Sequence, residues 1–181
     1  MNMMSPSVTG AGVSRGGQIA AGRKLLKLFT IKGLLPMTLE AAEGVVVNEH
    51  LRNGAVIGDL AVELMSPEFP RYFQAAPTTA PAVVVGGYEL GKPGTVSDCF
   101  DFLGEHKVDC DIPLIQGIRV LMHAGALLGP LGGLVVFRTK DDNGRPFLAG
   151  FSRTNTHLFV SRISRPHKSR LKIKDVVLTV N

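Results

Sequence analysis

The chain has 181 residues, and 45% of them are hydrophobic, a share that fits a folded globular domain and argues against a disordered protein. Two cysteines, Cys99 and Cys110, are too few for a disulfide scaffold and fit a reducing compartment. The formal net charge is +5, from 20 Lys and Arg against 15 Asp and Glu. The length predicts a flexible Gly-, Ser- and Ala-rich arm over residues 1–22 and a single folded domain over residues 23–181.

The first half of the chain predicts short strands with two helices between them. Thr38 is expected to cap a short helix over residues 39–43 that ends at Gly44. Thr95 to Asp98 matches a capping box that begins a second helix, which extends through Leu103. Four prolines predict a surface loop over residues 66–81. The predicted strands cover residues 25–31, 45–47, 55–65 and 82–90, with an Asn53-Gly54 turn before the third.

The second half of the chain is predicted to be persistently β. Asn143-Gly144 is a hairpin signal, and short strands at this spacing indicate an antiparallel sandwich or barrel. Val120 to Phe137 contains no charged residue, and we interpret it as two core strands joined by a glycine-rich turn, with shallow membrane contact left open. The fold class is therefore predicted to be all-β, a jelly-roll-type β-sandwich. Its later strands are expected at Ile112–Ala126, Leu134–Thr139, Phe147–Arg153, His157–Ile163 and Leu171–Val180.

Residues 86–92 have the G-x-x-x-x-G-K spacing of a phosphate-binding loop. Pro93 stands where that loop needs a hydroxyl for Mg²⁺ and the start of a helix, so a β-turn loop is predicted instead. No G-x-S-x-G elbow occurs, and no Cys/His or Ser/His/Asp group can be assembled by spacing. We therefore expect no enzyme activity, no catalytic residue and no cofactor.

Cys99, His106 and Cys110 are residue types that bind zinc, and a fourth ligand would have to come from a distance, for example His50 or His123. Structural zinc sites have four ligands at tighter, paired spacings. We therefore predict no metal site. The two cysteines are expected to be one buried and one surface residue that flank an acidic loop.

Positive charge is concentrated at the C-terminal end. Residues 151–181 hold seven bases and one acid, whereas the rest of the chain holds 13 bases and 14 acids. Bases and aliphatic residues alternate from Arg170 to Lys174, which in a strand places three cations on one face. Such a face can bind a phosphate backbone, or it can be a solvated edge strand that lysines protect against aggregation. The candidate nucleic-acid-binding residues are Arg162, Arg165, Lys168, Arg170, Lys172 and Lys174.

Residues 112–181 resemble a known family. The run Ile112–Val120 is similar to the central strand of the thirty-kilodalton superfamily of plant-virus movement proteins. Leu134–Asp142, with Arg145 shortly after, is similar to the strand of that family that ends in an aspartate, and the later predicted strands continue the same order. The resemblance implies a jelly-roll-like sandwich related to viral coat proteins. It also implies sequence-nonspecific binding of single-stranded nucleic acid and action at plasmodesmata.

Two alternative functions are therefore expected. The first is a viral movement-type protein that binds single-stranded nucleic acid, RNA in particular, in the host cytoplasm or at cell junctions. The second is a virion structural protein, a coat or capsid-associated subunit that assembles through its sandwich. Both predict a homo-oligomer, and peripheral membrane contact stays open for either.

Overall fold

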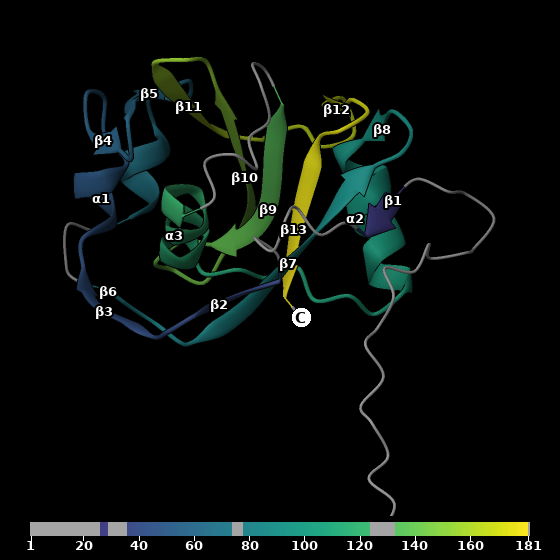
Figure 1. Ribbon diagram of the computed structural model, residues 1–181, viewed down its shortest axis with the longest axis horizontal. Coiled ribbons are helices and arrows are strands. Elements are labelled where there is room, and N and C mark those ends of the chain that lie inside the picture. Colours follow the sequence, from purple (N-terminus) through teal and green to yellow (C-terminus); the bar gives the residue numbers. More distant parts are fainter. Residues whose placement is uncertain (1–25, 29–35, 74–77, 124–132, 181) are drawn as a thin grey trace, which may run out of the picture.

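A computed structural model describes residues 26–28, 36–73, 78–123 and 133–180 of the protein (Figure 1). Its main sheet has nine strands: β1 (Leu26–Leu28), β2 (Met37–Leu39), β4 (Val56–Ile57), β5 (Leu60–Leu64), β7 (Val83–Leu90), β9 (Leu134–Lys140), β10 (Pro146–Arg153), β11 (His157–Arg162) and β13 (Val176–Val180). Two small sheets pair β3 (Ala42–Val45) with β6 (Thr78–Ala80) and β8 (Gly94–Thr95) with β12 (Arg170–Leu171). The helices are α1 (Val47–His50), the 3₁₀ helix η1 (Phe69–Tyr72), α2 (Val96–Glu105) and α3 (Leu114–His123).

The main sheet is mixed. Its strand order is β1-β7-β13-β9-β10-β11-β5-β4, and β2 also pairs with β7. The pairs β13–β9 and β11–β5 are parallel, and the remaining pairs are antiparallel. Strands β9, β10 and β11 form a meander whose first turn contains Gly144 at a φ of 75°, a left-handed conformation that favours glycine.

Helix α3 is enclosed by the protein. Figure 1 shows it between the strands β9 to β11 and the strands β2 and β3, and it contacts β2, β3 and β9. The fully buried Gln116 side chain donates hydrogen bonds from Nε2 to the carbonyl oxygens of Glu40, at 3.1 Å, and Pro81, at 2.6 Å. These bonds attach the helix to the links before β3 and β7, which leaves no donor of the buried amide group unpaired.

Helix α2 covers the opposite face of the sheet. Val135 and Phe137 of β9 belong to the core around α3, whereas Val136 belongs to the core formed with α2. Both faces of the first half of β9 are therefore buried, which explains why Leu134 to Phe137 is continuously apolar instead of alternating.

Much of the predicted β structure is confirmed. The chain is rich in strands, and the strands predicted over residues 82–90, 134–139, 147–153 and 157–163 are present as β7, β9, β10 and β11. The capping box is also confirmed. The Thr95 hydroxyl accepts from the Asp98 amide at 3.1 Å, and the Asp98 carboxylate accepts from the Thr95 amide at 3.3 Å. The jelly-roll connectivity stays a prediction.

Several predictions of secondary structure are wrong. The strand predicted over residues 45–47 is present only at Val45, the last residue of β3, because α1 begins at Val47. Residues 39–43 do not form a helix, because Thr38 lies in β2 opposite Val84 of β7 and β3 begins at Ala42. The strand predicted over Ile112–Ala126 is replaced by α3 up to His123. Apart from Gln116 and Arg119, α3 is apolar up to Met122, so its sequence can be mistaken for that of a buried strand.

Three smaller differences concern loops and turns. Residues 55–65 form the hairpin β4–β5 instead of one strand, with Gly58 at a φ of 61° in its turn. The predicted loop over residues 66–81 contains η1 and β6. The expected N-terminal arm and the glycine-rich turn at 129–133 lie wholly or mainly outside the described residues, as does most of the predicted strand 25–31 beyond β1.

Gly117 allows α3 to approach the sheet closely. A Cβ atom at this position would lie 2.7 Å from Cε2 of the Phe137 ring, which stacks on Phe151. We predict that Gly117→Ala lowers the free energy of unfolding by about 2 kcal/mol through overpacking. The matched control is Gly104→Ala in α2, where nothing lies within 4 Å and alanine should add up to about 1 kcal/mol. Urea unfolding measures both, and equal stability of the two variants would contradict the close approach.

Candidate functional site

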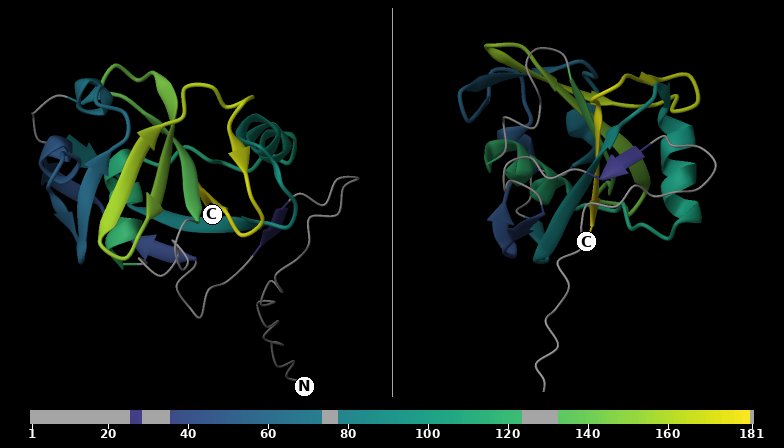
Figure 2. Two further views of the ribbon diagram at one scale, coloured as in Figure 1. Left: turned by 90° about the horizontal axis from the view of Figure 1, so that it is seen from above. Right: turned by 45° about the vertical axis from the view of Figure 1, so that its right-hand side comes forward.

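The basic C-terminal residues lie in a segment that crosses the N-terminal end of α2. We call residues 165–174 the basic segment. The amide of Val96 donates to Ser169 O at 2.9 Å and the amide of Ser97 donates to Pro166 O at 3.3 Å, so first-turn amides of α2 are satisfied by this segment. Figure 2 shows the segment, in yellow, beside α2. Its backbone is therefore fixed on the helix.

A buried carboxylate fixes the end of the basic segment. Asp175 is buried, and its side chain accepts hydrogen bonds from the amide of Lys172, at 2.6 Å, and from the amide of Leu134, at 2.9 Å. The Asp175 amide donates to Lys172 O at 3.1 Å, and Lys174 adopts a φ of 75°. These contacts close a tight turn over residues 172–175 between β12 and β13.

This turn shows that the predicted strand over Leu171–Val180 is wrong in its first part. Strand β12 ends at Leu171, and the side chain of Ile173, which an alternating strand would bury, is 56% exposed. Arg170, Lys172 and Lys174 are therefore not aligned on one pleated face. The alternation of charges matches a strand period, but the carboxylate of Asp175, directly before β13, holds the chain in a turn.

The basic segment nevertheless presents unpaired charge. Its five Arg and Lys side chains are all exposed, and the segment contains no Asp or Glu. Among the described residues, the ion pairs involve only Asp111 with Arg138 and Lys140, so none of the five cations has an acidic partner there. The exposed cations are Arg165, Lys168, Arg170, Lys172 and Lys174.

Arg162 does not belong to this group. Its Nη1 donates to the hydroxyl of Tyr72 in η1, and its guanidinium lies 4.5 Å from the centroid of the same ring. This cation–π contact and hydrogen bond hold the side chain at the end of β11. Arg162 is therefore already engaged by Tyr72, whereas the other five predicted residues all lie in the basic segment.

A pocket of about 170 Å³ adjoins the basic segment. It lies between α2 and the strands β9 and β10, and Pro166 of the basic segment forms part of its wall. We call it the α2 pocket. Its lining includes Ser97, Phe100, Asp101, Arg138, Pro146 and Pro166.

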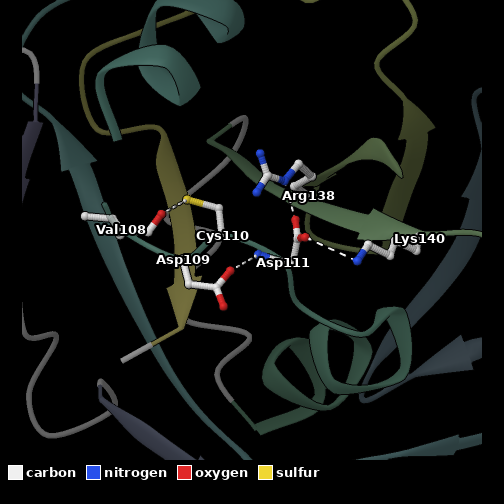
Figure 3. A network of polar contacts seen from close by, with 6 residues as sticks. All are labelled: Val108, Asp109, Cys110, Asp111, Arg138 and Lys140. Carbon is white, nitrogen blue, oxygen red and sulfur yellow. Dashed lines mark hydrogen bonds and ion pairs between the residues drawn. The ribbon is translucent and has the colours of Figure 1, made fainter. Parts of the chain in front are cut away.

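Arg138 is oriented by an ion-pair network beside the α2 pocket (Figure 3). Its Nε donates to the carboxylate of Asp111, whose other oxygen lies 3.5 Å from Nζ of Lys140. The amide of Asp111 donates to the Asp109 carboxylate at 2.9 Å. The network uses Nε of Arg138, and no described residue accepts from its two terminal nitrogens.

A larger cavity of about 360 Å³ lies at the N-terminal end of α3. Leu114 and Ile115 of the first helical turn line it together with Lys140 and Thr139. The Thr139 hydroxyl is buried and has no hydrogen-bond partner among the described residues. The lining also contains the carboxylates of Asp111 and Asp142, so the positive end of the helix is offset by negative charge.

Both cysteines are buried. Cys99 and Cys110 are both buried free thiols, so the prediction of one surface cysteine is wrong. Within the described residues, no three His, Cys, Asp or Glu side chains gather where they could hold a metal ion.

The glycine motif at residues 86–92 is not a β-turn loop over most of its length. Residues 86–90 belong to β7, so the predicted β-turn loop is wrong there.

No described helix is both long and apolar enough to span a membrane. Comparison of the chain with protein-family models, with curated protein sequences and with solved structures finds no match.

The Asp175 carboxylate should be important for stability. We predict that Asp175→Ala lowers the free energy of unfolding by about 3 kcal/mol, because two amides lose a charged acceptor. Trypsin should then cut faster after Lys172 and Lys174. The control is Asp59→Ala, an exposed turn residue whose removal should change stability by less than about 0.5 kcal/mol. If the two variants unfold at the same urea concentration, the anchoring role of Asp175 is disproved.

The thiols should be unreactive in the folded protein. Burial, reinforced by the nearby Asp98, raises the pKa of Cys99 to about 11, and burial likewise raises the pKa of Cys110 to about 11. Because the thiolate is the reactive form, its fraction near pH 8 should be about a hundredfold lower than in the unfolded chain. Disulfide-exchange labelling near pH 8, with and without urea, measures this, and the rate should rise as the pH approaches the raised pKa. Equally fast labelling in both states would contradict the burial of the thiols.

Proposed function

We propose that the protein binds nucleic acid through the exposed cations of the basic segment. The observation that carries the proposal is a group of exposed positive charges that have no acidic partner among the described residues. Five exposed Arg and Lys side chains occur within ten residues, and none has an acidic partner in the described part of the chain. Unpaired cations on a fixed backbone are suited to a polyanion with regularly spaced phosphates.

The fixed backbone matters for affinity. The hydrogen bonds to α2 and the Asp175 carboxylate hold the basic segment in one conformation, so binding need not order the main chain. The side chains themselves stay flexible, and phosphate contacts of this kind carry no sequence information. The proposal therefore includes sequence-independent binding that weakens steeply with salt.

Within this proposal, the role is that of a viral movement-type protein of jelly-roll ancestry, acting on single-stranded RNA. The succession of β9, β10 and β11 along residues 134–162, followed by β13, supports it, since the resemblance implies strands in this order. Residues 114–120 argue against a movement-type role. They belong to α3, whereas the resemblance implies a central strand there.

We predict that replacing Arg170, Lys172 and Lys174 with Ser weakens RNA binding and spares the fold, because all three side chains are exposed. Loss of three phosphate contacts should reduce the slope of log affinity against log salt by about 2 for a single strand. Fluorescence anisotropy with a labelled single-stranded RNA at several salt concentrations measures both quantities.

The control removes the same number of charges elsewhere, by Arg52→Ser, Arg71→Ser and Lys107→Asn. Asn is used at residue 107 because Lys107 has a φ of 56°. This control should keep most of the wild-type affinity and slope. If both triple variants lose affinity equally, net charge and not the basic segment is responsible. If vesicles with anionic lipid bind the wild type whereas RNA does not, the nucleic-acid proposal is wrong.

A further inference from the structure

We propose that the α2 pocket accepts an unpaired nucleobase, so that the protein selects single-stranded over double-stranded nucleic acid. This inference rests on the proposed function and assigns a second part of the same site. The basic segment would hold the phosphates, and the pocket would hold a base beside them.

The pocket lies next to the cations. Pro166 lines the pocket and belongs to the basic segment, where it follows the exposed Arg165. The Pro166 carbonyl accepts from the amide of Ser97, which also lines the pocket, at 3.3 Å. A nucleic-acid backbone bound to the cations would therefore pass beside the pocket.

The size and the walls of the pocket suit a flat ring. Its volume of about 170 Å³ equals roughly five or six waters at liquid density, which is close to the space that one aromatic base occupies. The partly exposed Phe100 ring provides an apolar wall, with Pro146 and Pro166 completing it. Aromatic side chains stack on bases of any identity, and this interaction is the usual way in which proteins hold unpaired bases.

The polar groups of the pocket add a preference among bases. One Asp101 oxygen accepts a hydrogen bond from the Ser97 hydroxyl at 3.3 Å, and the other has no partner among the described residues. A carboxylate accepts from the exocyclic amino group of cytosine, which uracil lacks. Arg138 offers its terminal nitrogens from the opposite wall, because its Nε is held by Asp111.

Base pairing explains the selectivity for single strands. In a duplex each base is stacked and paired, and its extraction costs free energy that an unpaired base does not require. The cations of the basic segment contact phosphates of either form. A base bound in the α2 pocket should therefore raise the affinity for single strands and leave the affinity for a duplex unchanged.

The test compares Phe100→Leu, which keeps apolar volume without a ring, with Phe100→Tyr, which keeps the ring. The matched control is Phe159→Leu, a partly exposed phenylalanine on β11 away from the pocket. The probes are a cytidine oligonucleotide, a uridine oligonucleotide of equal length and a duplex, each followed by fluorescence anisotropy over a range of salt.

We expect the wild type to bind the single strands more tightly than the duplex. Phe100→Leu should lose about tenfold in single-strand affinity, with an unchanged salt slope and unchanged duplex binding. Phe100→Tyr and Phe159→Leu should behave like the wild type. Asp101→Asn should reduce the preference for cytidine over uridine.

Two contrary results are distinguishable. Salt-dependent binding of single strands and duplex with equal affinity, unaffected by Phe100→Leu, would refute the base pocket and leave the phosphate contacts of the basic segment standing. If the wild type binds none of the three probes at low salt, the proposed function fails, and the base pocket fails with it.

Discussion

The buried carboxylate of Asp175 connects the parts of the molecule on which the functional proposals depend. It binds the amide of Leu134 at the start of β9 and the amide of Lys172 in the basic segment, and it directly precedes β13. Strands β9 and β13 are parallel neighbours at the centre of the main sheet. One side chain thus sets where two central strands begin and how the cations before them are presented. Without it, the turn over residues 172–175 would lose its anchor, and the cost of ordering that turn would oppose binding.

The fold could be predicted from the sequence where local signals and tertiary structure agree. The strands β9, β10 and β11 are bounded by turn residues such as Asn143-Gly144, and the capping box at Thr95 depends on neighbours three residues apart. The prediction of secondary structure is wrong where contacts between distant parts of the chain determine the local conformation. Helix α3 is mostly apolar because the protein encloses most of it, and a cap signal at Thr38 is overruled by pairing with β7.

The candidate site shows the same division. The five cations of residues 165–174 lie close together in the sequence, so the local composition is enough to identify them. Their arrangement depends on Asp175 and on α2, which the alternation of charges does not reveal. Phe100 and Arg138 were missed because they are far apart in the sequence, and only the packing of α2 on β9 and β10 brings them to the basic segment. Arg162 was included on charge alone, although Tyr72 already engages it.

Lysine footprinting on the intact protein tests the central claim most directly, namely that the basic segment contacts phosphate. Amines are acetylated briefly with and without single-stranded RNA, and the modified positions are read by mass spectrometry. The account predicts strong protection of Lys168, Lys172 and Lys174, with Lys107 and Lys140 modified as in the free protein, since all five are exposed. Unchanged acetylation of the first three while RNA is bound, or protection of Lys107 and Lys140 in their place, would contradict it.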